Sequence, residues 1–320
     1  MTAGFKYFKS TDSGAPTLNN AVGSFISVLD WALDISDPVN GWQKVYTGTN
    51  KAAYRPRAGL RYYLRVDESI AGTYALVRGY ESMTDVDTGV DPFPLLTKFA
   101  IGAFSISKTA SNVATARAYW GIKTARYVII VIRGNASNTT DNYVYAFGEV
   151  PTIHTGENYP FVVTGIGNGL ANYAGNSGLM SIASTTALGG GTYAPANSGF
   201  SGVLCWARNP SGSVKGVAGQ GVVSGTVGYS IADGSRVALR RFDIQYSATQ
   251  LAPGVAIGTQ TPRSYMPHLW STSADLNGAT WVVGDNFAMP DYNAGANFIY
   301  MGENNGVSII LETTDTAGAM

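Results

Sequence analysis

The residue types that most often carry acid–base or nucleophilic chemistry are few and scattered in this chain. The two histidines, His154 and His268, lie more than a hundred residues apart, and neither has neighbours at metal-ligand spacing. The one cysteine, Cys205, lies in the apolar run GVLCWAR, which predicts a buried strand position rather than a reactive thiol. The chain contains no G-x-S-x-G motif. We therefore expect no catalytic residue, no metal site and no enzymatic activity.

An acidic cluster in TDVDTGVDPFP, made of Asp85, Asp87 and Asp91, resembles the beginning of a calcium-binding loop. The further oxygen ligand and the closing bidentate glutamate of such a loop are missing. Aspartate side chains also accept hydrogen bonds from backbone groups two residues further on. The pattern favours an Asp-stabilised turn, and a calcium loop is the alternative.

Glycine motifs and acid pairs give no cofactor or glycosidase signal. In Gly165-Ile-Gly167-Asn-Gly169 the third glycine falls one residue short of the dinucleotide-binding fingerprint, and no helical pattern follows. The stretch Gly219 to Gly225 fails in the same way, and the pair Glu81 and Glu157 is one of many that 21 acids offer. We expect no cofactor. The 19 tyrosines and six tryptophans favour β cores and subunit interfaces, with a carbohydrate-stacking surface as the alternative.

The composition indicates a protein that associates with others. Lys and Arg number 21 and so do Asp and Glu, which gives zero net charge and argues against nucleic-acid binding. Only 13% of residues are charged, and low charge density favours association. The N-terminus lacks the apolar core of a signal peptide, and the best apolar run, YVIIVI, has the length of a strand. We expect a chain made in the cytoplasm, without a membrane span.

One segment, residues 18–34, has the apolar period of a helix. Apolar residues recur at three- and four-residue spacing between residues 18 and 34, on Val22, Phe25, Ile26, Leu29, Ala32 and Leu33. Asn19 or Asn20 is a candidate N-cap, and Pro38 lies beyond the end. A single amphipathic helix must bury its apolar stripe, so we expect it to pack on a β-sheet.

The rest of the chain reads as short strands separated by turns. The continuous apolar run Arg126 to Arg133 predicts a central strand buried on both faces, with Val128, Ile130 and Ile132 in the core beside Phe25, Ile26 and Leu29 of the helix. The predicted fold is mainly β, with two sandwich- or barrel-like domains. We place an N-terminal β domain at 1–168, a Gly/Ala/Ser-rich linker or insertion at 169–201, and a C-terminal β domain at 202–320.

Several motifs together resemble one known family. The runs KYFKSTDSGAPTLNNAVGSFISVLD, YTGTNKAAYRP, YYLRVDES and VRGYESMTDVDTGVDPFP are similar to the opening of a family of tailed-bacteriophage virion structural proteins. The later ATARAYWGIKTARYVIIVI and YAFGEVPTIHTGENYPFVVTGIG resemble its middle section, and VSIILETTDT resembles its closing strand. The resemblance covers most of the chain and is tight over Lys6 to Pro94.

The resemblance implies a virion component without enzymatic activity, present in many copies in the tail or its tip or baseplate. A capsid decoration or collar protein is one alternative, and a receptor- or glycan-binding tail module is another. The partners expected are further copies of the chain and other virion proteins, with a host-surface glycan under the last alternative. The residues expected at subunit contacts lie in the N-terminal arm and in the loop from Thr84 to Phe93, and they are Phe5, Tyr7, Phe8, Asp85, Asp87 and Phe93.

Overall fold

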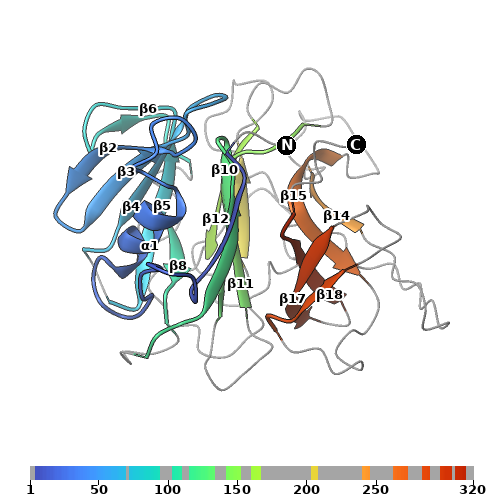
Figure 1. Cartoon of the computed structure of the whole chain (residues 1–320). Helices are drawn as coiled ribbons and strands as arrows, with labels where there is room; N and C mark the ends of the chain where they lie inside the picture. Colours follow the sequence, from blue (N-terminus) through green and yellow to red (C-terminus); the bar gives the residue numbers. More distant parts are fainter. Residues whose placement is uncertain are drawn as a thin grey trace, which may run out of the picture.

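The computed structural model of this chain describes residues 4–69, 72–93, 103–109, 115–133, 142–152, 160–166, 203–207, 240–245, 262–272, 283–288, 296–304 and 307–314. These residues form antiparallel β-sheets and one helix near the N-terminus (Figure 1). The predicted mainly-β class, with an N-terminal helix, is confirmed. The linker predicted at 169–201 and the side chain of Cys205 lie outside the described residues, as does His154.

The first sheet contains eleven strands and most of the first half of the chain. Its strands follow the order β1-β9-β10-β11-β12-β8-β5-β4-β3-β2, and β13 pairs with β12 beside this path. The bounds are β1 Lys6–Lys9, β2 Gln43–Gly48, β3 Lys51–Arg55, β4 Tyr63–Asp67, β5 Tyr74–Tyr80, β8 Phe104–Ser107, β9 Tyr119–Lys123, β10 Tyr127–Arg133, β11 Asn142–Glu149, β12 Phe161–Ile166 and β13 Val203–Ala207.

Two smaller sheets complete the described structure. A five-stranded sheet has the order β14-β15-β18-β17-β16, and a short hairpin pairs β6 with β7. The bounds are β6 Ser82–Met83, β7 Gly89–Val90, β14 Arg240–Gln245, β15 Pro262–Thr272, β16 Asn286–Ala288, β17 Asn297–Asn304 and β18 Val307–Glu312.

The helix α1 runs from Ser24 to Ala32, so it is shorter than the predicted 18–34. Val22 belongs to the predicted apolar stripe, but it precedes the helix and its side chain is 48% exposed. Neither asparagine caps the helix: Gly23 is the N-cap residue, in the left-handed region at φ 84°, and Asn19 Oδ1 accepts a bond from the Ala21 amide instead. In the described part of the chain, no helix is long and apolar enough to cross a membrane.

A buried carboxylate next to the first sheet accepts the hydrogen bonds that an N-cap side chain would otherwise accept. Glu68, just after β4, accepts hydrogen bonds from the backbone amides of Gly23 and Ile26, the second at 2.9 Å. Its Oε2 also lies 3.0 Å from Lys108 Nζ, and both side chains are fully buried. Because the first amides of a helix have no intrahelical partners and carry partial positive charge, a carboxylate there stabilises the helix. The sheet therefore fixes where α1 begins.

Lysines from two strands lie at the other end of α1. Lys6 of β1 donates to the carbonyl of Trp31 at 3.5 Å and pairs with Asp34 at 2.5 Å. Lys123 of β9 pairs with the second oxygen of Asp34 at 2.8 Å. The helix itself has no acidic residue in its first turn and no basic residue in its last turn. Both of its dipole ends are therefore neutralised by residues that the sheet supplies.

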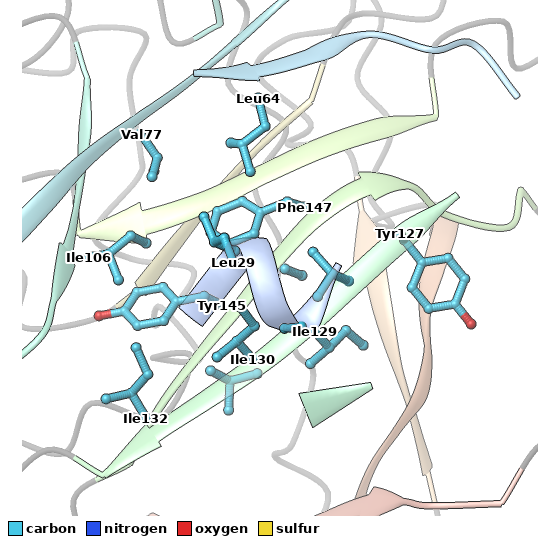
Figure 2. Close-up of a cluster of buried hydrophobic side chains, with 14 of the residues drawn as sticks. Leu29, Leu64, Val77, Ile106, Tyr127, Ile129, Ile130, Ile132, Tyr145 and Phe147 are labelled. Atoms are coloured by element: carbon cyan, nitrogen blue, oxygen red, sulfur yellow. The ribbon is translucent and has the colours of Figure 1, made fainter. Parts of the chain in front are cut away.

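The main core lies around α1, between the two halves of the first sheet (Figure 2). In this view Leu29 lies beside Phe147, with Leu64 and Val77 on one side and Ile130 on the other. All six predicted core residues are buried: Phe25, Ile26, Leu29, Val128, Ile130 and Ile132. On the predicted helix face Val22 is the exception, since it is exposed, whereas every residue of β10 except Arg133 is buried.

The other face of β10 packs against the five-stranded sheet, which explains why this strand is apolar on both sides. Tyr127 and Ile129 point away from the helix (Figure 2), and the Tyr127 ring lies 6.4 Å from the His268 ring of β15. Met266, Leu269 and Ile299 of the second sheet belong to the same continuous core as the first sheet. The division into two domains remains a prediction, but β13 lies within the segment predicted as C-terminal and adds to the first sheet.

The N-terminal segment is a strand of the first sheet and not a free arm. β1 pairs with β9 along its length, from Lys6 opposite Lys123 to Lys9 opposite Trp120. Phe8 is fully buried, and its ring occupies the space above Gly121, where a Cβ would lie 2.4 Å from the ring. The prediction of Phe8 as a subunit contact is therefore wrong, because the side chain has no exposed surface. Phe5 and Tyr7 are half-buried and pack against the core.

Candidate functional site

The outer face of strands β2 to β5 carries polar and aromatic side chains, in contrast to the inner face. Alternate residues point to opposite faces of a strand. The residues that point inward, such as Leu64 and Val66, belong to the core around α1. The residues that point outward form two cross-strand pairs, in which Tyr63 faces Tyr80 and Arg65 faces Arg78. This face also contains Tyr46, whose ring stacks on Tyr63 at 6.2 Å between centroids.

The hairpin β6–β7 lies across part of this face and covers it. The Tyr46 hydroxyl donates to the Met83 carbonyl at 2.8 Å, and Arg65 Nε donates to the Val86 carbonyl at 2.7 Å. Gly89 sits against the Tyr80 ring so closely that a Cβ there would lie 2.4 Å from it. Met83, Tyr80, Tyr63 and Ala53 form a small buried cluster under the hairpin. The hairpin is therefore held by side chains of all four strands beneath it.

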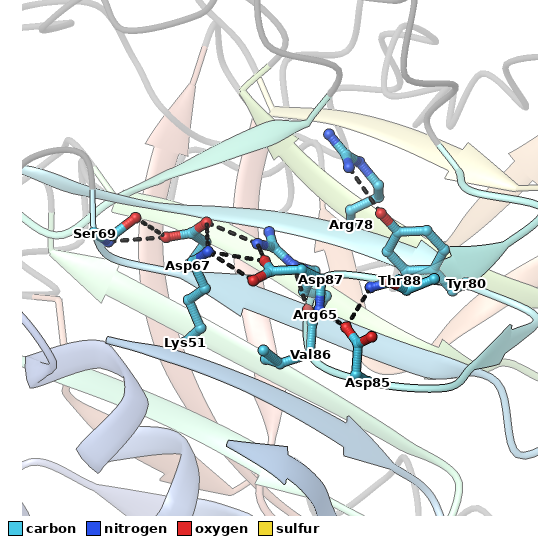
Figure 3. A network of polar contacts seen from close by, with 10 residues as sticks. All are labelled: Lys51, Arg65, Asp67, Ser69, Arg78, Tyr80, Asp85, Val86, Asp87 and Thr88. Carbon is cyan, nitrogen blue, oxygen red and sulfur yellow. Dashed lines mark hydrogen bonds and ion pairs between the residues drawn. The ribbon is translucent and has the colours of Figure 1, made fainter. Parts of the chain in front are cut away.

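Four charged side chains tie the tip of the hairpin to the sheet (Figure 3). Asp87 accepts from Lys51 at 2.8 Å and from Arg65 at 2.6 Å. Arg65 also pairs with Asp67 at 2.8 Å, and Asp67 is held by the amide and hydroxyl of Ser69. Two cations and two carboxylates thus balance one another. Hydrogen bonding to Lys51 and Arg65 lowers the pKa of Asp87, so this carboxyl is ionised at neutral pH.

The tip of the hairpin is an Asp-stabilised turn, as the sequence favours. Asp85 Oδ1 accepts hydrogen bonds from the amides of Asp87 at 2.7 Å and Thr88 at 2.8 Å (Figure 3). These bonds, that of the Asp87 amide first, lower the pKa of Asp85 although its side chain is exposed. The calcium alternative finds no support here, because Asp87 is already paired with two cations. In the described ranges, no group of three or more His, Cys, Asp or Glu side chains is placed to hold a metal.

The hairpin ends at Phe93, which anchors it in the core. Phe93 and Gly79 of β5 exchange two backbone hydrogen bonds, at 2.8 and 2.9 Å. The Phe93 ring fills the space above Gly79, where a Cβ would lie 2.2 Å from it, and it packs edge-on against Phe161. Phe93 is fully buried. Its prediction as a subunit contact is therefore wrong, whereas Asp85 and Asp87 are exposed at the tip.

Two arginines converge at the opposite end of the same face. Arg55, at the end of β3, donates to Gln43 Oε1 through Nε at 3.2 Å and Nη2 at 2.8 Å. Arg61 Nη2 lies 3.4 Å from the same oxygen. Arg55 also covers the Tyr63 ring at 5.3 Å and donates to its hydroxyl at 3.0 Å. Among the described residues, no carboxylate forms an ion pair with either guanidinium, and their shared acceptor is a neutral amide.

This arrangement differs only from that of some of the other described cations, because four more likewise form no ion pair with a described carboxylate: Lys9, Arg57, Arg117 and Arg133. Seven of the described cations lie within 3.0 Å of a carboxylate oxygen: Lys6, Lys44, Lys51, Arg65, Lys108, Lys123 and Arg126. Glu149 is an acid near Arg61, since it accepts a bond from the Leu60 amide, but its ion pair is with Arg126. Among the described residues, the outer face therefore has two guanidinium groups without an ion pair at the Arg55 end and a carboxylate without an ion pair, Asp85, at the hairpin tip.

The described residues of this face present charged groups at both of its ends. Sequence reasoning missed Arg55, Arg61 and Gln43, because the loop between β3 and β4 and the β2–β3 pairing bring them together. The predicted contact residues are divided: Asp85 and Asp87 lie on this face, while Tyr7 of β1 and Phe5 just before it lie at the opposite edge of the sheet order. Comparison with known proteins finds no matching family and no matching curated protein.

Proposed function

We propose that this protein is a structural component of a tailed-phage virion, most specifically of the tail or its tip, which acts by assembly of multiple copies. The proposal rests on the resemblance between residues 6–94 and the opening of that family. It is supported by the low charge density and by the β-sheet architecture of the described residues. Capsid decoration or a collar position is the alternative within the same class.

One observation carries the proposal, namely the way in which the motif GYESMTDVDTGVDPFP is built. Its middle forms the β6–β7 hairpin, its single phenylalanine anchors the hairpin in the core, and its aspartates fix the tip. Turns that serve only to connect strands do not need such anchoring. A contact surface benefits from it, because residues that are already ordered lose less conformational entropy when a partner binds.

A glycan-binding module is less well supported by the described part of this face. Saccharides stack on open aromatic rings, yet the Tyr63 ring lies between Arg55 and Tyr46, and Tyr80 is almost fully buried under the hairpin. The second half of the chain lies largely outside the described residues. Binding of host polysaccharide, followed by the fluorescence of the purified protein, tests this alternative directly.

Immunogold labelling of intact virions tests the proposed function. Antibody raised against the purified protein is applied to particles of the phage that encodes it. We expect label at the distal end of the tail. Label over the head or neck would favour the decoration or collar alternative, and particles without label under conditions that expose all layers would overturn the virion assignment.

A further inference from the structure

We propose that the outer face of β2 to β5 is a self-complementary interface, in which the Arg55–Arg61 end of one copy pairs with the Asp85 hairpin tip of a second copy and the reverse. This inference names a partner for the surface described above. It rests on the proposed function only in that both invoke multi-copy assembly.

The first step is that each end of the face carries a charge without a described counter-ion. Arg55 and Arg61 share only the neutral oxygen of Gln43. Asp85 uses Oδ1 for the turn and has no described contact with a cation. Between them, Lys51, Arg65, Asp67 and Asp87 neutralise one another, and Arg78, which faces Arg65, donates to the Tyr80 hydroxyl.

The second step is the separation of the two ends. Asp87, two residues from Asp85, pairs with Lys51 at the beginning of β3, and Arg55 lies at the end of that strand. Four residues of strand separate these positions by about 13 Å. A face that is positive at one end and negative at the other becomes complementary to itself after a rotation of half a turn about an axis that lies in the plane of the interface, at right angles to the line joining the two ends. This is the condition for an isologous two-fold dimer.

The third step concerns the chemistry of the guanidinium groups. An arginine side chain has five donors in a planar fork that matches a carboxylate. The Arg55 group is held in place by Tyr63 and Gln43, so it loses little freedom on binding. Exposed aliphatic side chains accompany both ends, since Leu60 precedes Arg61 and Val90 belongs to β7. A second copy supplies the carboxylate, whereas a saccharide would require an aromatic face that this surface has covered.

Charge exchange in the full-length protein tests the pairing. We expect the parent chain to sediment as a dimer whose dissociation increases with salt concentration, because the pairs at its ends are ionic. Asp85→Asn keeps an oxygen for the turn and removes the charge, and Arg61→Glu reverses the charge at the other end. Asp85→Lys should weaken association about tenfold or more, because the new lysine would lie opposite Arg55 and Arg61 of the second copy and repel both. Asp37→Asn is the matched control, because Asp37 caps a similar exposed turn away from this face.

A mixture of two single variants gives the decisive measurement. At a protein concentration between the dissociation constants of the parent chain and of the variants, Asp85→Lys and Arg61→Glu should each be monomeric alone. They should form a heterodimer when mixed, because the exchanged pair and the retained native pair are both attractive. Restoration requires both chains to be folded, so a folding defect cannot mimic it. Dimers that persist in both single variants, a parent chain that is monomeric at all concentrations, or a mixture without heterodimers would overturn the proposal. Virion labelling is unaffected by these outcomes, so the proposed function is tested separately.

Discussion

At the scale of single residues, the buried pair of Lys108 and Glu68 has the largest consequence for stability. Glu68 joins β4, α1 and the strand end at Lys108, and it is fully buried. Breaking a buried ion pair from one side leaves an uncompensated charge, which costs about 3–5 kcal/mol. We expect Glu68→Gln to lower the free energy of unfolding near neutral pH by about this amount, measured by urea denaturation. Adding Lys108→Met to that variant removes the orphaned charge and should recover part of the loss.

The same pair predicts a pH dependence with a definite sign. Burial lowers the pKa of Lys108, and Glu68 opposes that shift, so removing the Glu68 charge lowers the pKa further. Between this lowered pKa and the unfolded value near 10, the unfolded chain binds more protons than the folded chain. Stability then rises with pH. The loss in free energy of unfolding caused by Glu68→Gln should therefore be greatest near neutral pH and become smaller as the pH approaches about 10. A deficit that is constant over this range would contradict a charged Lys108.

The aspartates of the hairpin predict a pH dependence of the same sign at acid pH, with stability lost as the pH falls. Hydrogen bonds from the Asp87 amide lower the pKa of Asp85, and those from Lys51 lower the pKa of Asp87. Their contribution is complete above the unfolded pKa near 4 and is lost as the pH falls through the folded values. We expect the protection of the Asp87 and Thr88 amides against hydrogen exchange to fall below about pH 4, while that of β10 persists. Equal loss in both segments would show global unfolding instead.

At the scale of elements, the hairpin depends on a glycine in the strand beneath its anchor. A Cβ at Gly79 would lie 2.2 Å from the Phe93 ring. Gly79→Ala should therefore cost about 1–3 kcal/mol by overpacking and should release the hairpin from the sheet. Phe93→Ala should cost about 3–5 kcal/mol by itself, because it empties a core position.

The double variant distinguishes overpacking from an effect of Gly79 on the strand alone. If the ring is the cause, Gly79→Ala should cost little once Phe93 is alanine, so the two changes should be strongly non-additive in denaturation experiments. Additive costs would refute the contact as the reason for glycine at this position. Hydrogen exchange of the hairpin amides in each variant reports whether the anchor or the ionic network holds the tip.

At the scale of the whole molecule, the two large sheets share one core, which bears on the predicted division into domains. Ile129 of β10 and Leu269 of β15 belong to the same cluster. Leu269→Ala should cost about 2–5 kcal/mol, and we expect the amides of β10 and β17 to lose protection against exchange by the same amount. A loss confined to β17 would instead support two independently folding domains.

What could be predicted from the sequence follows from local regularity. The six core positions of the helix and the apolar strand can be read from the sequence, because the residues that follow the apolar period are the buried ones. The Asp85 turn can be read as well, because an aspartate side chain forms such a turn with the backbone amides of the next few residues. The N-cap of α1, in contrast, was assigned to asparagines close by. The structure uses Glu68 instead, which lies more than forty residues further along the chain.

The sequence does not show which aromatic residues near charged motifs are buried and which are exposed. Phe8 and Phe93 follow the same patterns as exposed contact residues, yet each fills a space that a glycine on a neighbouring strand leaves open. Likewise, Gln43, Arg55 and Arg61 meet only through strand pairing and a loop.

The sequence by itself determined the mainly-β class, the position of the helix, its buried face and the turn at the hairpin tip, because each depends on interactions within a few residues. Only the tertiary structure decided which strand lies beside which, how both ends of the helix are neutralised, and where charges are left without a described counter-ion. The physical reason is that a strand satisfies its hydrogen bonds with partners distant in sequence, and the side chains it brings together depend on that pairing.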